Sequence, residues 1–313
     1  MRLLTGCDRW SPGSSTPILM PELPEVELLC RRLDERGAGR TISRLDLASF
    51  AALKTFDPPL RSLVGRRFEE CHRRGKFICV QLGAVDGSSA DPEWLVIHLA
   101  RGGWVKWRDK LTTAPVKVGR GPLALRVGFE EGDGFDVTEM GHEKRLAIWT
   151  AHSPDDIEQV ATLGPEPLDP EFTEERCGSI LRAEKAYLKH ALSRQSVIAG
   201  VGNAYSDEAL HAARLSPFKP ASNLSDDELS RLYSSLIAVL REAIDRAESL
   251  DLDQLKDGKR GAMRVHGRTG EACPVCGDVV REVSFATRSL QYCATCQTGG
   301  KPLADRRLSR LLK

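Results

Sequence analysis

The chain has 313 residues, of which 41% are hydrophobic, so it can form two or three small domains with real cores. No apolar run approaches the ~20 residues of a membrane span, and a soluble protein is expected. The net charge is only +1, yet residues 256–313 carry 12 Lys/Arg against 5 Asp/Glu, which leaves the first 255 residues near −6. This asymmetry favours a polyanionic partner, although a solvated basic tail has the same composition.

Residues 1–19 are rich in Ser, Pro and Gly and lack the apolar core of a signal peptide. They are predicted to be a disordered leader or the result of a mis-called start codon before Met20. If they remain attached, the nitrogen of Pro21 is a tertiary amide.

The next segment starts at Pro21-Glu22 and continues into apolar residues at helical spacing. If the chain began at Pro21, its secondary amine would be a nucleophile, because free α-amino groups titrate near ~7.7–8.0. Glu22 beside it would serve as general acid or base. The alternative is an ordinary helix start, since proline and glutamate both suit the first turn.

From Thr41 to about Trp149 the pattern predicts mostly strands, which would form an antiparallel sandwich behind the N-terminal helix. Four apolar runs stand out: 77–82, 94–99, 123–129 and 145–149. The basic stretch Arg73-Arg-Gly-Lys76 precedes the first of them. It is either a solvated turn or a means of presenting Lys76 to a phosphodiester.

After residue 164 the pattern becomes helical to about residue 250, and Ser225-Asp-Asp-Glu228 is typical of a capping box. The corner Gly200-Val-Gly-Asn203 opens a helix whose free N–H groups would suit a phosphate, with Lys185 and Lys189 on a preceding helix. An ordinary helix–turn–helix corner has the same pattern.

Nine cysteines are present, and five of them are scattered singly. The other four form two Cys-x-x-Cys pairs sixteen residues apart, which predicts one closed, structural zinc site and a reducing intracellular compartment. These four are Cys273, Cys276, Cys293 and Cys296. The segment between the pairs has hairpin length, and Arg288 near its tip is a candidate contact to phosphate or base, or a generic surface arginine.

Together these stretches resemble the formamidopyrimidine-DNA glycosylase and endonuclease VIII family, from Met20 to about Gln297. Five motifs carry the resemblance in the family's order: Pro21-Glu-Leu-Pro-Glu-Val-Glu27, Arg73-Arg-Gly-Lys-Phe77, Leu163-Gly-Pro-Glu-Pro-Leu168, Gly200-Val-Gly-Asn203, and the four-cysteine finger with Arg288.

The resemblance implies an α+β multidomain protein. Its expected parts are a catalytic β-sandwich with a leading helix (20–150), a helix–two-turn–helix domain (163–255) and a zinc finger (268–297). A leader (1–19) precedes these parts, and a basic tail (298–313) extends past the usual end of the family. The resemblance also implies base-excision repair of double-stranded damaged DNA by a protein that flips the damaged nucleotide out of the duplex. Nothing in the sequence requires more than a monomer. Cytoplasmic, nucleoid-associated localisation is expected.

The resemblance also assigns roles at the reacting centre. Pro21 would attack C1′, displace the oxidised base and form a Schiff base, Glu22 would protonate the ribose oxygen, and Lys76 would hold phosphate. β- and δ-elimination would then cut the strand. Asn203 and Arg288 would grip the flanking phosphates, with Lys185 adding charge.

Two stretches that would contact the DNA bases depart from the family pattern. The usual His-Leu-Gly-Met-Ser-Gly is replaced by His98-Leu-Ala-Arg-Gly-Gly, with Ala100 taken to stand at the methionine position. In the loop that probes the orphaned base, Lys144, Arg145 and Leu146 replace the family's Arg-Arg-Phe, so Lys144 and Leu146 would act as cation and wedge.

The segment 256–264, expected to cap a flipped base, is also short. These departures lean toward the endonuclease VIII side of the family. They leave open a family member that binds lesions without excision, or one that acts mainly as an abasic-site lyase. An unrelated zinc-ribbon protein would explain the cysteines but not the Pro-Glu start.

Overall fold

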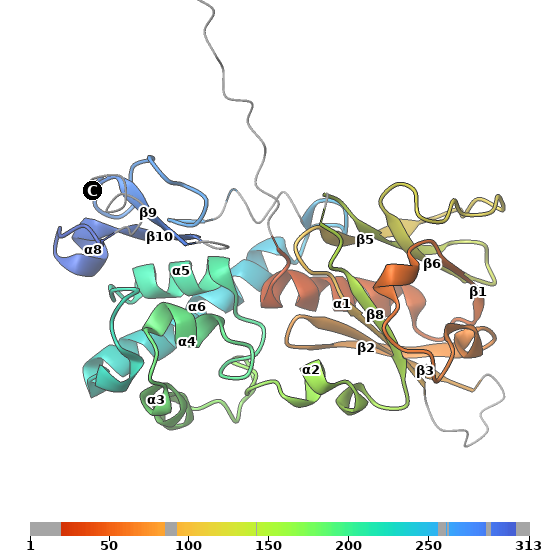
Figure 1. Ribbon diagram of the computed structural model, residues 1–313, viewed down its shortest axis with the longest axis horizontal. Helices are drawn as coiled ribbons and strands as arrows, with labels where there is room; N and C mark the ends of the chain where they lie inside the picture. The colour runs from red at the N-terminus through yellow and green to blue at the C-terminus, as the bar shows by residue number, and fades with distance from the viewer. Residues whose placement is uncertain are drawn as a thin grey trace, which may run out of the picture.

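The computed structural model describes residues 20–84, 93–141, 143–255, 261, 263–285 and 289–304 (Figure 1). The predicted leader, Arg288 and the tail beyond residue 304 lie outside these described residues. The polypeptide forms a β-sandwich on one side, a helical domain on the other, and a small hairpin domain next to the helices.

Helix α1 (Leu23–Gly37) leads the chain, as the apolar periodicity predicts. Glu22 precedes its first turn, and the Glu22 N–H donates to the Glu25 carboxylate at 2.8 Å. Val26, Leu29 and Leu33 are fully buried, so the apolar face of the helix points into the core.

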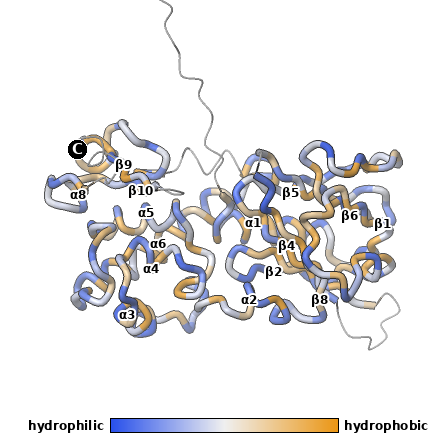
Figure 2. Tube along the Cα trace, in the orientation of Figure 1, coloured by the Kyte–Doolittle hydropathy of each residue, from blue (hydrophilic) through white to orange (hydrophobic). Residues whose placement is uncertain are grey.

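Two four-stranded antiparallel sheets form the sandwich, in the orders β1-β6-β7-β5 and β2-β3-β4-β8. Their strands are β1 (Ile42–Leu47), β2 (Arg67–Arg74), β3 (Phe77–Gly83), β4 (Glu93–His98), β5 (Gly103–Arg108), β6 (Leu123–Phe129), β7 (Gly134–Glu139) and β8 (Ala147–Ala151). The four predicted apolar runs correspond to β3, β4, β6 and β8. In Figure 2 hydrophobic stretches follow the strands of the sandwich around β4 and β8.

The helical domain follows the sandwich. Its helices are α2 (Glu158–Ala161), α3 (Glu174–Ala183), α4 (Leu188–Ser193), α5 (Asn203–Ala212) and α6 (Asp226–Ala247). The predicted capping box opens α6: the Ser225 N–H donates to Glu228 at 3.0 Å, and the Glu228 N–H donates to the Ser225 hydroxyl at 3.3 Å. Short 3-10 turns at Phe50–Ala52, Leu60–Leu63, Pro154–Asp156 and Ala221–Asn223 complete these two parts.

The last described part is a hairpin of β9 (Val280–Ser284) and β10 (Ser289–Cys293), followed by α8 (Ala294–Thr298). It docks on α5 through the Gln291 N–H, which donates to Asp207, and on the segment after α5 through the Gln297 amide, which donates to the carbonyl of Leu215. The predicted α+β architecture, with a sandwich, a helical domain and a four-cysteine finger, is therefore confirmed.

One continuous apolar core joins the sandwich to the helical domain, with α1 between them. Polar contacts reinforce the junction, including the Trp104 indole N–H, which donates to the carbonyl of Leu252 at 2.9 Å. The two parts are thus packed against each other through a shared core. Within the described residues, no helix has the length and apolar character needed to cross a membrane.

Candidate active site and nucleic-acid interface

Lys76 lies in the tight turn between β2 and β3, where Gly75 adopts a φ of +57°. Glu166 clamps this turn by accepting from the Gly75 N–H at 2.5 Å and from the Arg73 guanidinium at 2.6 Å. The Leu163–Leu168 junction therefore fixes the position of Lys76, which is only 8% exposed.

The Glu22 carboxylate occupies the N-terminus of α5. It accepts from the backbone N–H groups of Gly202 at 2.7 Å, Ala204 at 2.8 Å and Tyr205 at 3.3 Å. These donors and the positive end of the helix stabilise negative charge on this buried carboxylate. The prediction that this helix start receives a phosphate needs correction, because a side chain from 180 residues earlier already fills it.

Gly202 allows Lys76 and Glu22 to meet. A Cβ on Gly202 would lie 2.4 Å from the Lys76 Nζ and 2.5 Å from the Glu22 Cδ. Both groups therefore approach the bare backbone of the corner, and the ammonium and carboxylate of the two predicted reacting residues lie in one place.

Pro21 is buried directly before Glu22. The following Leu23 N–H donates to the Gly200 carbonyl at 3.0 Å, which fastens the start of α1 to the same corner. Met20 precedes Pro21 in the chain, so the proline nitrogen is a tertiary amide in this form.

His98 is a member of this site that the sequence analysis did not single out. It pairs with Phe77 across the sheet, and their rings lie 4.8 Å apart. Burial lowers the pKa of His98 to about 4, and the nearby positive charge of Lys76 is the smaller of the two causes. Only the strand register reveals it, because it places His98 opposite the residue that follows Lys76.

The two lysines predicted to flank the corner differ in role. Lys189, on α4, is buried and donates to Asp207 at 2.6 Å, Ser206 at 2.9 Å and the Asn203 carbonyl at 2.6 Å. It therefore fixes α5 and is not presented to solvent. Lys185 lies in the exposed connector before α4, not on a helix.

Asn203, the first residue of α5, reaches the finger. Its side-chain amide donates to the carbonyl of Ser289 at 2.8 Å. Ser289 is the residue after Arg288, so Asn203 contacts the hairpin beside the predicted phosphate-gripping arginine.

The loop before β8 folds back on the sandwich. The buried Glu139 carboxylate accepts from the N–H groups of Arg145 at 2.6 Å and Leu146 at 2.9 Å, and the Lys144 ammonium donates to the Glu139 carbonyl. Leu146 is only 2% exposed and belongs to the core, so it does not lie where a wedge would have to be. The Arg145 side chain is 69% exposed and is the outward-facing cation of this loop.

The β4–β5 turn also requires a correction. Counted from His98, the fourth residue of the segment is Arg101, so Arg101 and not Ala100 stands at the family's methionine position. Ala100 is 8% exposed and has a φ of +50°, whereas Arg101 is exposed at the turn.

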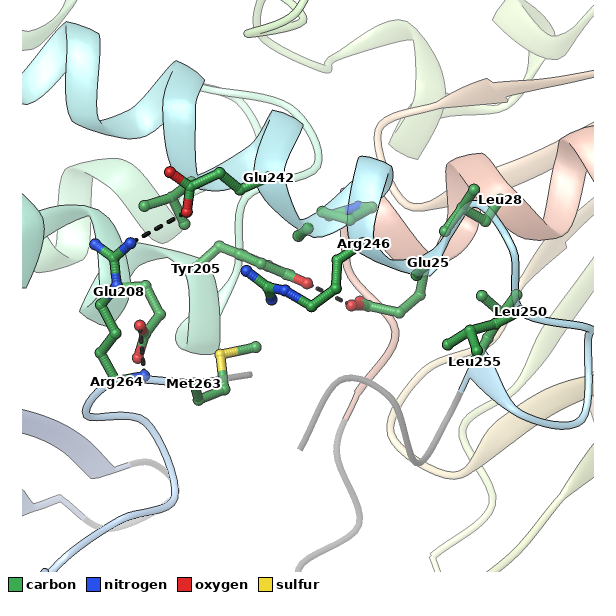
Figure 3. A pocket seen from close by; sticks show the side chains of 14 residues that line it. Glu25, Leu28, Tyr205, Glu208, Glu242, Arg246, Leu250, Leu255, Met263 and Arg264 are labelled. Atoms are coloured by element: carbon green, nitrogen blue, oxygen red, sulfur yellow. Dashed lines mark hydrogen bonds and ion pairs between the residues drawn. The ribbon is translucent and has the colours of Figure 1, made fainter. Parts of the chain in front are cut away.

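A cavity of about 270 Å³ opens beside this centre, between α1, α5, α6 and the segment that follows α6 (Figure 3). At its inner wall the Tyr205 hydroxyl donates to Glu25 at 2.6 Å. Burial and the neighbouring Glu25 raise the pKa of Tyr205 well above its usual value, so the hydroxyl keeps its proton. Arg246 and Met263 line the opening.

The four predicted zinc ligands come together. Their sulfur atoms all lie within 4.8 Å of one another, with Cys276 and Cys293 at 3.3 Å and Cys273 and Cys296 at 3.9 Å. Sulfurs bound at ~2.3 Å to one tetrahedral ion are roughly 3.8 Å apart, so this cluster fits a structural Zn²⁺. The hairpin with its four cysteines is therefore a zinc finger.

The fold and these sites define a β-sandwich protein with a helical domain and a zinc finger. Sequence comparison gives three family matches in chain order: the formamidopyrimidine-DNA glycosylase N-terminal domain at residues 20–140, the glycosylase's H2TH domain at 163–253, and the zinc finger found in FPG and IleRS at 270–299.

A formamidopyrimidine-DNA glycosylase of Symbiobacterium thermophilum is 35% identical over 290 residues, which is 89% of each chain. An uncharacterized formamidopyrimidine-DNA glycosylase-like protein of Mycobacterium tuberculosis is 52% identical over 155 residues, covering 50% of this chain and 97% of its own. Lactococcus lactis Fpg, solved in complex with abasic-site DNA, aligns with a TM-score of 0.75 and 26% identity over 88% of this chain and 99% of its own. The chain belongs to the formamidopyrimidine-DNA glycosylase/endonuclease VIII family.

Proposed function

We propose that this protein is a base-excision repair enzyme that removes oxidised bases from double-stranded DNA and cleaves the strand at the resulting abasic site. The observation that carries the proposal is the meeting of Glu22 and Lys76 at Gly202, directly beside Pro21. A carboxylate, an ammonium and a potential N-terminal secondary amine are the groups that Schiff-base chemistry at a sugar carbon needs.

The active form begins at Pro21, because only a free secondary amine can attack. Its nitrogen forms a bond to C1′ as the bond from C1′ to the base breaks, and the departing base takes a proton from solvent. The Glu22 carboxylate takes the proton from the proline nitrogen and passes it to the ribose oxygen as the ring opens to an iminium. Loss of a C2′ proton then breaks the bond to the 3′ oxygen, and a second elimination breaks the bond to the 5′ oxygen. Lys76 holds the phosphate and assists these proton transfers.

The cavity beside Tyr205 is the proposed pocket for the flipped base. It is several times larger than the ~30 Å³ share of one water molecule, and Pro24 and Glu25 in the first turn of α1 are among the residues that line it. Glu25 and the Tyr205 hydroxyl provide polar partners, while Met263 and Leu255 provide apolar walls.

The phosphates on either side of the flipped nucleotide are assigned to charged and neutral polar side chains around this centre. Lys76 and His98 serve the reacting sugar, Arg288 and Asn203 serve the finger side, and Lys185 and Arg145 are exposed on the flanks. A monomer suffices for this arrangement. Because chromosomal DNA is the substrate, the protein is expected to act in the cytoplasm at the nucleoid.

A second candidate function is an enzyme that acts mainly at pre-existing abasic sites. Two observations favour it: Arg101 replaces the apolar residue expected to fill the hole left by a flipped base, and Leu146 is buried in the core. At an abasic site no base has to be extracted, so less filling of the stack is required.

The test is borohydride trapping on duplexes that carry an abasic site, 8-oxoguanine or an oxidised pyrimidine. We expect protein starting at Pro21 to form a covalent adduct, and protein starting at Met1 or carrying Pro21→Gly to form none. Trapping on the abasic duplex alone would select the second candidate. Tight binding without any adduct would contradict both.

A further inference from the structure

One buried histidine of the helical domain reaches the zinc finger. His211, near the end of α5, is 2% exposed, and its Nε2 lies 3.3 Å from the Cys273 Sγ. Within the described residues, this hydrogen bond joins a zinc-ligating sulfur to a side chain that lies outside the finger.

The direction of this hydrogen bond follows from the metal site. With zinc bound, the Cys273 sulfur is a thiolate and can only accept. The Nε2 must therefore carry the hydrogen, and His211 donates to a metal ligand.

The same helix also contacts the proposed active site. At its N-terminus α5 holds the Glu22 carboxylate, and roughly 13 Å further along, at ~1.5 Å per residue, it places His211. Between these ends Asp207 accepts from the Gln291 N–H at 3.2 Å, and Glu208 accepts from the Val265 and His266 N–H groups at 2.9 Å each. The finger and the segment directly before it are thus attached to α5 at several points between Asn203 and His211.

We propose that His211 is a positioning residue of the zinc site, which donates its Nε2–H to the Cys273 thiolate and fastens the metal centre to α5. The donated hydrogen bond stabilises the sulfur as a thiolate, which opposes its protonation and lowers its nucleophilicity. It therefore retards loss of zinc and reaction of Cys273 with electrophiles, and it fixes the finger relative to the helix that holds Glu22. This role requires zinc but does not depend on the proposed glycosylase chemistry.

The first experiment uses the full chain with His211→Phe and measures zinc affinity by competition with a chromogenic chelator. Loss of such an outer hydrogen-bond partner typically lowers metal affinity about 10- to 100-fold, and we expect a loss in this range. His190→Phe is the matched control, because His190 is exposed on α4 and should leave the affinity unchanged. An unchanged affinity in His211→Phe would overturn the proposal.

The second experiment separates the hydrogen bond from simple packing. With Co²⁺ in place of zinc, the thiolate-to-cobalt absorption should shift to lower energy in His211→Phe, because the sulfur loses its donor. A loss of affinity with an unshifted band would mean that His211 acts by packing alone and would refute the proposed role.

Should His211→Phe fail to fold, a pair of amide variants decides the question. The amide N–H of His211→Gln can reach Cys273 and should retain the wild-type band, whereas the shorter His211→Asn should show the shift. Identical spectra for these two variants would exclude the hydrogen bond.

Discussion

Gly202 shows how a single absent side chain shapes the proposed active site. Replacing it with alanine puts a methyl group 2.4 Å from the Lys76 Nζ and 2.5 Å from the Glu22 Cδ, so both groups must move. A displacement near 1 Å at a reacting centre can lower the rate about 100-fold. We therefore expect Gly202→Ala to lower the rate of borohydride trapping on abasic DNA by about this factor.

The control for this prediction is Gly178→Ala. Its added methyl group would lie 2.4 Å from the Leu229 side chain in the helical core, far from Glu22. It should lower the melting temperature but retain the trapping rate. Equal losses of activity in the two variants would show that overpacking in general, rather than the Glu22–Lys76 geometry, limits the reaction.

His98 makes stability depend on pH at the same site. Its pKa is lowered from 6.5 to about 4 in the folded state, so between these values the unfolded chain binds more protons than the folded one. His98 therefore contributes a loss of stability as the pH falls from about 6.5 toward 4, and no change above that window. In His98→Gln the melting temperature should fall less steeply across this window than in wild type, and parallel curves would contradict the assignment.

At the scale of secondary structure, the sequence pattern predicts elements that bury a regular apolar face. This holds for α1, the four apolar strands and α6 with its capping box. The strands β1, β2, β5 and β7 lie outside the four predicted runs. In β2 and β7 the reason is that Arg67–Arg74 and Gly134–Glu139 lack a continuous apolar run. Sheet pairing places them, and pairing is not a local property.

The candidate site was predicted only in part for the same reason. Motifs pointed to Pro21, Glu22, Lys76 and the four cysteines, but not to the binding of Glu22 by the N-terminus of α5, which depends on packing between distant segments. Periodicity also cannot distinguish a buried lysine from an exposed one. For this reason the sequence places Lys189 beside the corner as added positive charge, although its side chain is buried against Asp207.

Lys189 and Lys185 are expected to differ in how much they contribute to stability. Lys189→Met leaves the fully buried Asp207 carboxylate without its closest cation, which typically costs ~3–5 kcal/mol of stability. Lys185→Met removes only an exposed charge, so its stability should stay within ~0.5 kcal/mol of wild type. Urea denaturation measures both, and equal stabilities would show that the Lys189–Asp207 pair is unimportant.

For the whole molecule, zinc links folding of the finger to DNA binding. Because α5 contacts both the finger and Glu22, removal of zinc should abolish most binding to abasic-site duplexes, while the sandwich retains its β-sheet circular dichroism. Fluorescence anisotropy before and after chelation, with zinc added back as control, tests this. A chelated protein that binds at full affinity would show that the finger is dispensable.

The uneven charge of the chain sets the strength of binding and its dependence on salt. Residues 256–313 are strongly basic while the rest is acidic, so binding should rest on a few placed cations rather than on overall attraction. If Lys76, Arg145, Lys185 and Arg288 each neutralise one phosphate, log affinity should fall against log salt with a slope near ~3.6, at ~0.9 per contact.

Lys185→Met should reduce this slope by ~0.9. The control is Lys54→Met, which removes an exposed lysine that donates to the Ala51 carbonyl on the sandwich and should leave the slope unchanged. A slope near zero in wild type would contradict the phosphate contacts, and an equal reduction in both variants would show that total charge rather than position governs binding.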